Sequence, residues 1–300
     1  MDIIGKKKWY FIFSLIIIIP GVISLALFGL RLSIDFTGGS LLEFRIQNSE
    51  FRNKNEEVGE IIKTIDVEVS SIQLSGENTY LVRMKPIDKD KNEEVKKALA
   101  EKYGKIEELR FETVGPTIGK ELSINALKAL VFASALIVLY IAWSFRKVPK
   151  PASSWRFGVC AIVALLPDVL VVIGIFSFLG HFMHVEVDSL FVTALLTVIG
   201  FSVHDTIVVF DRIRENLRKL KKPEPYEEIV NRSVNETIVR SINTSCTVLL
   251  VLCAIFFLGG ETTRYFSLVL ILGIVFGTYS SIFVASPLLV VWHKLSAKRN

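Results

Sequence analysis

Asp205 is a carboxylate inside an apolar stretch, residues 190–210, that is long enough to cross a lipid bilayer. Inserting an ionised side chain at that depth costs about 3 kcal/mol, so such a residue is expected to carry function. Arg240 opens the next apolar run, and the reversed chain direction places it at a similar depth. We predict a buried pair of opposite charges that handles a proton or another cation. A salt bridge that only holds two helices together is the alternative.

Other polar residues follow the same two runs. Thr193, Thr197 and Asp205 recur near helical spacing and predict a polar stripe that faces protein or water. A second polar face is expected in the following run, formed by Arg240, Asn243, Thr244 and Thr247. Asp168 follows Pro167 in the preceding apolar run, and both a relay and a helix-packing carboxylate fit its position. We therefore add Asp168 and Thr197 to the candidate ion pathway, on weaker grounds than Asp205 and Arg240.

Small residues in the last apolar run predict a close helix contact. Gly273, Gly277 and Ser281 are spaced four apart, which is the small-xxx-small pattern of packed membrane helices. The chain has three cysteines, and all of them lie in apolar runs. We expect no disulfide framework, no metal site and no cofactor.

The elements that position these residues follow from hydrophobicity. The chain is 51% hydrophobic, yet 22% of its residues are charged. The two populations separate, because six apolar runs are long enough to span a bilayer. They lie at residues 9–30, 126–145, 157–179, 190–210, 242–258 and 266–292. We predict an α-helical membrane protein with six spans, in which the first span is a retained anchor rather than a cleaved signal peptide.

Basic residues predict the orientation of these spans. They gather before the first span and after the second, fourth and sixth, at Lys6, Lys7, Lys8, Arg146, Arg156, Arg212, Arg214, Arg218, Lys294 and Lys298. The positive-inside rule then places both termini in the cytoplasm and residues 31–122 outside the membrane. The basic excess reflects topology, so we expect no nucleic-acid partner.

The polar stretch at residues 31–122 has the length of a small domain. Its patterns predict a strand at 40–46, a helix at 50–64, a hairpin of strands 67–74 and 79–84, a helix at 88–103 and a strand at 106–114. This βαββαβ order is that of a ferredoxin-like α+β domain. It contains no constellation of nucleophile, base or metal ligands, so we expect no enzyme. A five-helix bundle at 123–300 follows.

Glycine-rich motifs mark the entrance to this domain and its exit. Asp35, Gly38 and Gly39 follow the first span, and Gly115 with Pro116 precede the second. Paired glycines permit positive φ or close backbone approach, so we predict tight, shaped turns at both places. Between the fourth and fifth spans, residues 211–240 are predicted to be a cytoplasmic loop containing an amphipathic helix that lies along the membrane interface.

Four segments together resemble the SecF family of bacterial protein-export membrane subunits, in the resistance–nodulation–division superfamily. They are IDFTGGS at 34–40, VGPTIGKEL at 114–122, GFSVHDTIVVFDRIREN at 200–216 and NRSVNETIVRSINTS at 231–245. Motif order and predicted topology agree with that family over nearly the whole chain.

The resemblance implies a subunit of the plasma membrane that assists the translocation of polypeptides. It implies SecD as a separate partner chain, the SecYEG channel, and SecA and YajC as further partners. It also implies use of a proton gradient, or a sodium gradient, with Asp205 and Arg240 matching the family's membrane aspartate and arginine. Asp168 matches a position that is usually acidic in the family.

Two other functions remain open from the residues. The same superfamily includes exporters of small molecules and lipids, so the chain could be half of such a transporter. A passive assembly subunit without ion flux is the second alternative, and it predicts that Asp205 and Arg240 tolerate joint apolar replacement.

Overall fold

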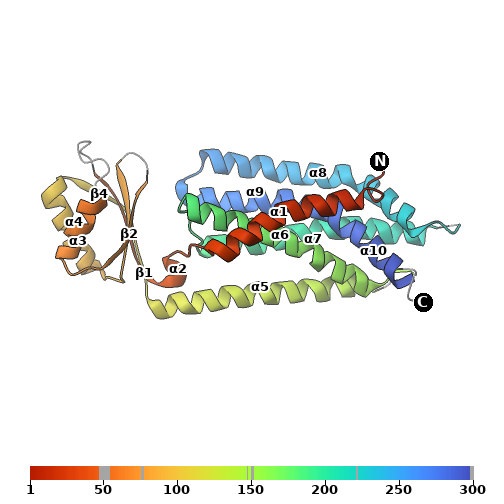
Figure 1. The fold of residues 1–300 in the computed structure, drawn as a ribbon, viewed down its shortest axis with the longest axis horizontal. Coiled ribbons are helices and arrows are strands. Elements are labelled where there is room, and N and C mark those ends of the chain that lie inside the picture. The colour runs from red at the N-terminus through yellow and green to blue at the C-terminus, as the bar shows by residue number, and fades with distance from the viewer. Residues whose placement is uncertain (47–54, 76–77, 147, 150–151, 221, 298–300) are drawn as a thin grey trace. The chain divides into compact units, whose positions relative to one another are not determined.

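The computed structural model describes residues 1–46, 55–75, 78–146, 148–149, 152–220 and 222–297. The chain divides into two compact units (Figure 1). We call Met1–Arg31 with Lys128–Asn300 the membrane bundle, and Leu32–Leu127 the sheet domain.

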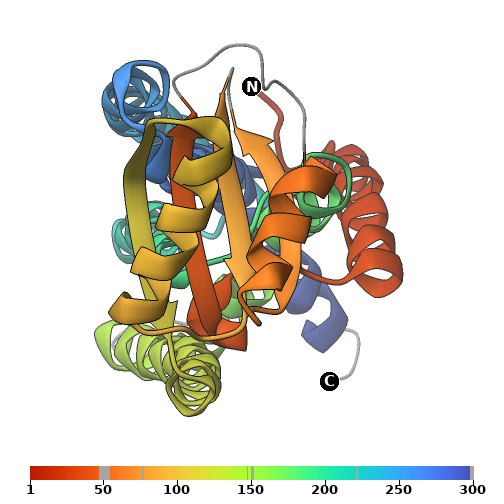
Figure 2. The ribbon, with the colours of Figure 1, turned by 90° about the vertical axis from the view of Figure 1, so that its left-hand side faces the viewer.

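The sheet domain is built on four antiparallel strands in the order β2-β3-β1-β4. The strands are β1 (Gly39–Ile46), β2 (Val69–Ser75), β3 (Thr79–Met84) and β4 (Ile106–Val114). Two helices, α3 (Asn55–Thr64) and α4 (Lys89–Tyr103), lie across one face of the sheet (Figure 2). The predicted βαββαβ element order is confirmed. Residues 50–54 of the predicted first helix and residues 76–77 of the predicted hairpin turn lie outside the described residues.

Alternation along the strands explains this layering. Leu42, Phe44 and Ile46 of β1 are buried beneath the helices, and the period of two turns the intervening side chains to the other face. Each fully buried side chain of this size contributes about 1.5–3 kcal/mol relative to an exposed one. Asp88 caps α4 by accepting a hydrogen bond from the Lys91 amide at 2.8 Å, which satisfies an amide that the first turn leaves unpaired.

The two glycine motifs pack against each other. The predicted turn after the first span holds a short helix, α2 (Ile34–Thr37), which Ser33 caps through the Asp35 amide at 3.2 Å. Gly38 follows with φ +74°, and a Cβ at that position would lie 2.8 Å from the Pro116 Cα. Glycine is therefore required at Gly38 both by its backbone conformation and by the start of the next helix.

Six helical segments among the described residues are long and apolar enough to cross a membrane, as predicted. The helices of the membrane bundle are α1 (Lys7–Phe28), α5 (Pro116–Ser144, whose first residues belong to the sheet domain), α6 (Ser154–Phe182), α7 (Ser189–Arg218), α8 (Tyr226–Leu258), α9 (Glu261–Ser280), the π-helical segment η2 (Ser281–Ala285) and α10 (Ser286–Ala297). The last three elements follow one another directly and form the sixth span.

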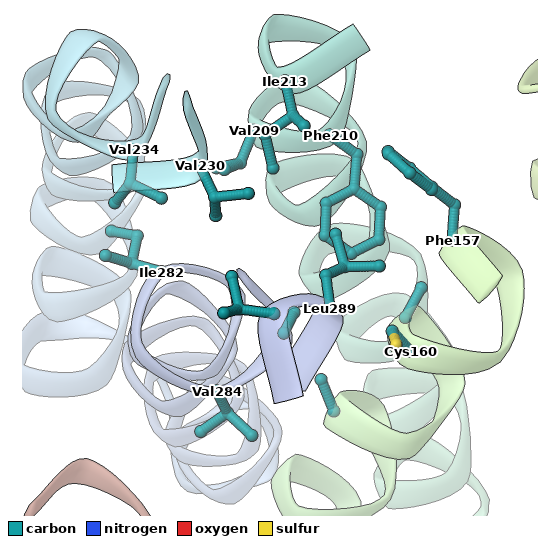
Figure 3. Close-up of a cluster of buried hydrophobic side chains, with 14 of the residues drawn as sticks. Phe157, Cys160, Val209, Phe210, Ile213, Val230, Val234, Ile282, Val284 and Leu289 are labelled. Atoms are coloured by element: carbon teal, nitrogen blue, oxygen red, sulfur yellow. The ribbon is translucent and has the colours of Figure 1, made fainter. Parts of the chain in front are cut away.

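The prediction that a separate helix lies along the membrane interface before the fifth span is wrong. Residues 226–240 continue directly into the span as one helix, α8. The amphipathic face that suggested membrane binding instead packs into the bundle core, where Val230 and Val234 lie with Phe210 and Leu289 (Figure 3). An apolar stripe on a helix requires an apolar surface, and here the protein supplies it.

Close helix crossings hold the bundle together. The Cβ that an alanine at Gly174 would add lies 2.4 Å from the Gly21 Cα, so α1 and α6 touch backbone to backbone. One turn further along, the hydroxyls of Ser24 and Ser177 form a buried hydrogen bond at 3.1 Å. Small residues permit such approach where no hydrophobic force drives association.

Candidate functional site

Asp205 is buried where three helices meet. Its side chain lies on α7 and is 2% exposed. One carboxylate oxygen, Oδ2, accepts hydrogen bonds from Thr278 Oγ1 on α9 at 3.0 Å and from Ser245 Oγ on α8 at 3.4 Å. The hydroxyls of Ser245 and Thr278 also contact each other at 2.6 Å. Asp205 thus belongs to a compact polar cluster in an apolar bundle.

Arg240 does not pair with Asp205 within this chain, contrary to our expectation. Among the described residues no ion pair joins the two, and the Arg240 side chain is exposed. The reason is helical geometry. Ser245, which does reach Asp205, lies about 7.5 Å along α8 from Arg240 and about 140° around the helix. Position in the chain did not predict the direction in which Arg240 points.

An exposed polar face runs along α8. The side chains of Arg240, Asn243, Thr244 and Thr247 are all exposed. The threonine hydroxyls donate back to carbonyls of their own helix, Thr244 to Arg240 O at 2.9 Å and Thr247 to Thr244 O at 2.7 Å. These four residues form the single face that their spacing predicts.

Thr193 and Thr197 do not share a face with Asp205. Both threonines are exposed, and Thr197 Oγ1 donates to the Thr193 carbonyl at 2.9 Å, whereas Asp205 is buried. At about 100° per residue, Asp205 lies about 80° around α7 from Thr197. The predicted stripe therefore divides into an exposed row and a buried carboxylate.

Asp168 is the second buried carboxylate. It lies on α6, is 2% exposed, and its Oδ2 accepts hydrogen bonds from Ser202 Oγ on α7 at 2.6 Å and from Ser280 Oγ on α9 at 2.7 Å. Asp168 also lines a cavity of about 20 Å³, together with Ser14, Tyr279 and Ser280 among mostly apolar side chains. Such a volume holds one water molecule.

Further hydroxyls connect the surroundings of the two carboxylates. Ser281 Oγ donates to the Ser202 carbonyl at 3.0 Å and lies 2.7 Å from Thr206 Oγ1. Sequence reasoning missed the hydroxyl residues of this cluster, which are Ser202, Thr206, Ser245, Thr278 and Ser280. Their signal was available in the spacing of small hydroxyl residues within apolar runs, as in Ser202–Thr206 on α7.

The glycine seam of α9 brings these groups together. An added Cβ at Gly273 would lie 2.1 Å from Val198 Cγ2, and one at Gly277 would lie 2.9 Å from Ser202 Cβ. Both neighbours belong to α7. Because glycine has no side chain at these two positions, α9 approaches α7 closely enough for Ser280 and Ser202 to reach the same carboxylate oxygen of Asp168.

Ser241 adds an unsatisfied hydroxyl to the face of α8 that carries Ser245. Its side chain is 2% exposed, and its Oγ has no hydrogen-bond partner among the described residues. A buried donor without a partner costs about 1–3 kcal/mol, so such a group calls for an explanation. It lies one helical turn from Ser245, on the same face of α8.

This arrangement suits the exchange of a small cation. An ionised carboxylate in a low-dielectric interior is costly unless it is paired, and no Lys, Arg or His among the described residues forms an ion pair with Asp168 or Asp205. Hydroxyl groups both donate and accept, so they can serve a carboxyl group in either protonation state. The described part of the chain holds no group of three His, Cys, Asp or Glu that could bind a metal ion.

The fold and the site define a polytopic membrane protein with carboxylates buried between its helices and a small α+β domain inserted after its first span. Comparison with protein families identifies it further. The family model for "Protein export membrane protein SecD/SecF, C-terminal" matches residues 94–295, and that for "SecD/SecF GG Motif" matches residues 23–50, which include Gly38 and Gly39. The chain belongs to the SecD/SecF protein-export family.

Individual relatives agree with this assignment. The chain is 46% identical to protein translocase subunit SecF of Thermobaculum terrenum, over 97% of this chain and 94% of the relative. It is 45% identical to protein translocase subunit SecF of Anaerolinea thermophila, over the same shares of both chains. The crystal structure of SecDF, a translocon-associated membrane protein from Thermus thermophilus, superposes with a TM-score of 0.83 at 36% identity. That match covers 98% of this chain and 39% of the longer SecDF chain.

Proposed function

We propose that this protein is the SecF-type subunit of a protein translocase in the plasma membrane. It works with a SecD-type partner, supplied as a separate chain, beside the SecYEG channel. A transmembrane gradient of protons, or of sodium, drives the export of polypeptides. Both termini lie in the cytoplasm and the sheet domain lies outside, as the distribution of basic residues favours.

The observation that carries the proposal is the exposed polar face of α8. An arginine and three further polar side chains on one face of a spanning helix are not expected to face lipid, because polar groups in spans turn toward protein or water. The face therefore fits a partner subunit. Fusion in the Thermus relative supports the same conclusion, because this chain accounts for only 39% of that SecDF chain.

In the proposed mechanism Asp205 on α7 takes up the cation. Arg240 lies on the neighbouring helix, α8, on the face that we assign to the partner subunit. Uptake neutralises Asp205 and weakens its attraction for hydroxyl donors, so the contacts with Ser245 and Thr278 change. Two helix packings of similar free energy would then alternate, and the sheet domain would follow the spans to which it is joined. One charge crossing a potential of 100 mV supplies about 2.3 kcal/mol, which is enough to bias such an equilibrium.

The test replaces Asp205 by Asn in the full-length chain, expressed with its partner in cells that lack the native subunit. We expect the uncoupler-sensitive part of protein export to disappear, while co-purification with the partner and the channel persists. Asp211→Asn is the matched control, since it removes an exposed carboxylate of the same helix. Normal gradient-dependent export by Asp205→Asn would refute the proposal.

The same assay separates the alternatives. Export that survives the joint change of Asp205 and Arg240 to Leu would identify a passive assembly subunit. Recovery of no translocase component with the tagged chain would favour a half-transporter of small molecules or lipids. Replacing sodium by potassium at constant pH distinguishes the two candidate ions, since only a sodium-coupled protein would lose activity.

A further inference from the structure

Two buried carboxylates on neighbouring helices are bridged by one short piece of a third helix. Thr278 on α9 donates to Asp205 at 3.0 Å, and Ser280, two residues later, donates to Asp168 at 2.7 Å. Ser281 then bonds the carbonyl of Ser202 at 3.0 Å. We call residues 278–281 the bridging segment. It has hydroxyl side chains at each of its four positions, including Tyr279.

The bridging segment lies where the backbone changes its hydrogen-bonding pattern. The α-helical part of the span ends at Ser280, and the π-helical segment η2 begins at Ser281. Short π-helical insertions are rare and occur frequently at functional sites. In η2 the backbone hydrogen bonds span five residues instead of four, so the regular ladder of the span is interrupted next to the donors of both carboxylates.

The two ends of the segment cannot move independently. Thr278 and Ser280 are separated by one residue in a helix, so a displacement of one is passed to the other through covalent bonds. Ser202 reinforces the connection from α7, because its hydroxyl donates to Asp168 at 2.6 Å and its helix also carries Asp205. A change in the hydrogen bonds of Asp205 therefore reaches the donors of Asp168 by two routes.

We propose that Asp168 is a second proton-exchanging carboxylate, and that the bridging segment couples its protonation to that of Asp205. The proposal rests on the proposed function, in which Asp205 takes up and releases a cation. The proton that leaves Asp168 passes to a water molecule in the adjoining cavity of about 20 Å³, which Ser14 and Tyr279 also line. The carboxylate that remains keeps the hydroxyls of Ser202 and Ser280 as donors.

The groups that face Asp168 from each neighbouring element are few. α1 contributes Ser14, α7 contributes Ser202, and α9 contributes Tyr279 and Ser280. Of these only Tyr279 is titratable, and its hydroxyl donates to the Tyr10 carbonyl at 3.0 Å. Asp205 is the one further acidic group that bonds to the bridging segment among the described residues, through Thr278, and the titratable neighbour of Asp205 itself is His204 on α7. The protonation of Asp168 is thus expected to respond chiefly to Asp205.

The first experiment records the carbonyl stretch of protonated carboxylic acids by infrared difference spectroscopy during a pH titration. It uses the full-length chain reconstituted in lipid with its partner. Asp168→Asn and Asp205→Asn each identify one band by its loss. Thr278→Val removes a donor from Asp205 only, and we expect it to move the titration midpoint of Asp168 by about one pH unit, a tenfold change in proton affinity.

The reverse measurement must agree. Ser280→Ala removes a donor from Asp168 only, and it is expected to move the midpoint of Asp205. Coupling between two protonation sites is reciprocal, and Asn replaces the neutral acid at each site, so we expect Asp168→Asn and Asp205→Asn to shift the remaining carboxylate in the same direction and by comparable amounts. Ser177→Ala, which removes a buried hydroxyl elsewhere on α6, serves as the matched control and should move neither band.

An activity measurement distinguishes exchange from a purely structural role. In Asp168→Asn the amide oxygen can still accept from Ser202 and Ser280, but the side chain has no proton that titrates. We expect Asp168→Asn to retain thermal stability and to lose at least tenfold of the gradient-dependent export rate. Full export by this variant would overturn the inference. So would a Thr278→Val variant in which only the Asp205 band shifts and the Asp168 band does not. Either result leaves the role of Asp205 intact. Export unaffected by Asp205→Asn would instead refute the proposed function.

Discussion

Replacing Gly273 by Ala tests whether the contact between α7 and α9 holds the buried network together. The added Cβ would lie 2.1 Å from Val198 Cγ2 and 2.4 Å from Cγ1, far inside the 3.5–4.0 Å at which carbon atoms attract. Val198 is fully buried, and its β-branched side chain has little rotamer freedom in a helix. The collision must therefore be relieved by moving one helix away from the other.

The expected cost follows from three contributions. Overpacking of this kind costs about 3 kcal/mol at the upper end of its usual range. Separation of the helices also weakens the hydrogen bonds that α9 donates to Asp168 and Asp205, and a bond to a charged group is worth about 1.5–3 kcal/mol. Alanine recovers about 1 kcal/mol in helix propensity. If the bonds are weakened by about 1 kcal/mol rather than lost, that cost and the gain in helix propensity cancel, and we expect Gly273→Ala to lower the free energy of unfolding by about 3 kcal/mol.

A graded series of alanine variants provides the control. Gly277→Ala meets Ser202 Cβ at 2.9 Å and should cost less, whereas Gly200→Ala meets no atom within 4 Å and should be neutral or slightly stabilising. Denaturant titration can follow the reaction of buried Cys160 with a thiol reagent, once the other two cysteines are replaced by Ala. If Gly273→Ala were as stable as Gly200→Ala, the packing argument would be wrong.

Three further outcomes follow from the rest of the molecule. Gly38→Ala and Gly104→Ala both place a side chain at positive φ, but only the Cβ added at position 38 would also collide with a neighbour. We therefore expect Gly38→Ala to destabilise the protein by at least 1 kcal/mol more than Gly104→Ala in thermal unfolding. Asn231→Ala removes the acceptor of two amides in the N-terminal segment, and we expect faster hydrogen exchange there. Burial raises the pKa of Tyr103 to about 12. The phenol is ordinarily ionised above about pH 10, so its stabilisation of the sheet domain should be lost as the pH rises from 10 to 12, and Tyr103→Phe should flatten that loss in alkaline unfolding followed by circular dichroism.

The spans and the sheet domain were predictable because their signals are one-dimensional. Apolar runs of sufficient length specify six spans, and alternation specifies the strands. The predictions failed where orientation about a helix axis decided the result. Ser245 rather than Arg240 faces Asp205, because Ser245 lies further along α8 and on another side of that helix. A single sequence offers no way to choose the neighbour of each face before the helix crossings are known.

The amphipathic stretch before the fifth span shows a second limit. Ile229, Val230 and Val234 recur at helical spacing, which is compatible with a membrane surface and with a protein core. The choice depends on whether other elements bring an apolar surface to the same place. Here α7 and α10 do so, through residues such as Phe210 and Leu289. That information is distributed over distant parts of the chain.

The chemistry of the buried site is decided by what surrounds each carboxylate. An arginine in contact would favour the ionised form of Asp168 or Asp205 in every conformation and so oppose proton uptake. A wholly apolar pocket would favour the neutral form just as strongly and oppose release. Hydroxyl donors on one oxygen, as Ser202 and Ser280 provide for Asp168, serve the ionised acid and also the carbonyl oxygen of the neutral one. Small movements of these donors can therefore favour either protonation state, which is the property that the proposed coupling to a gradient requires.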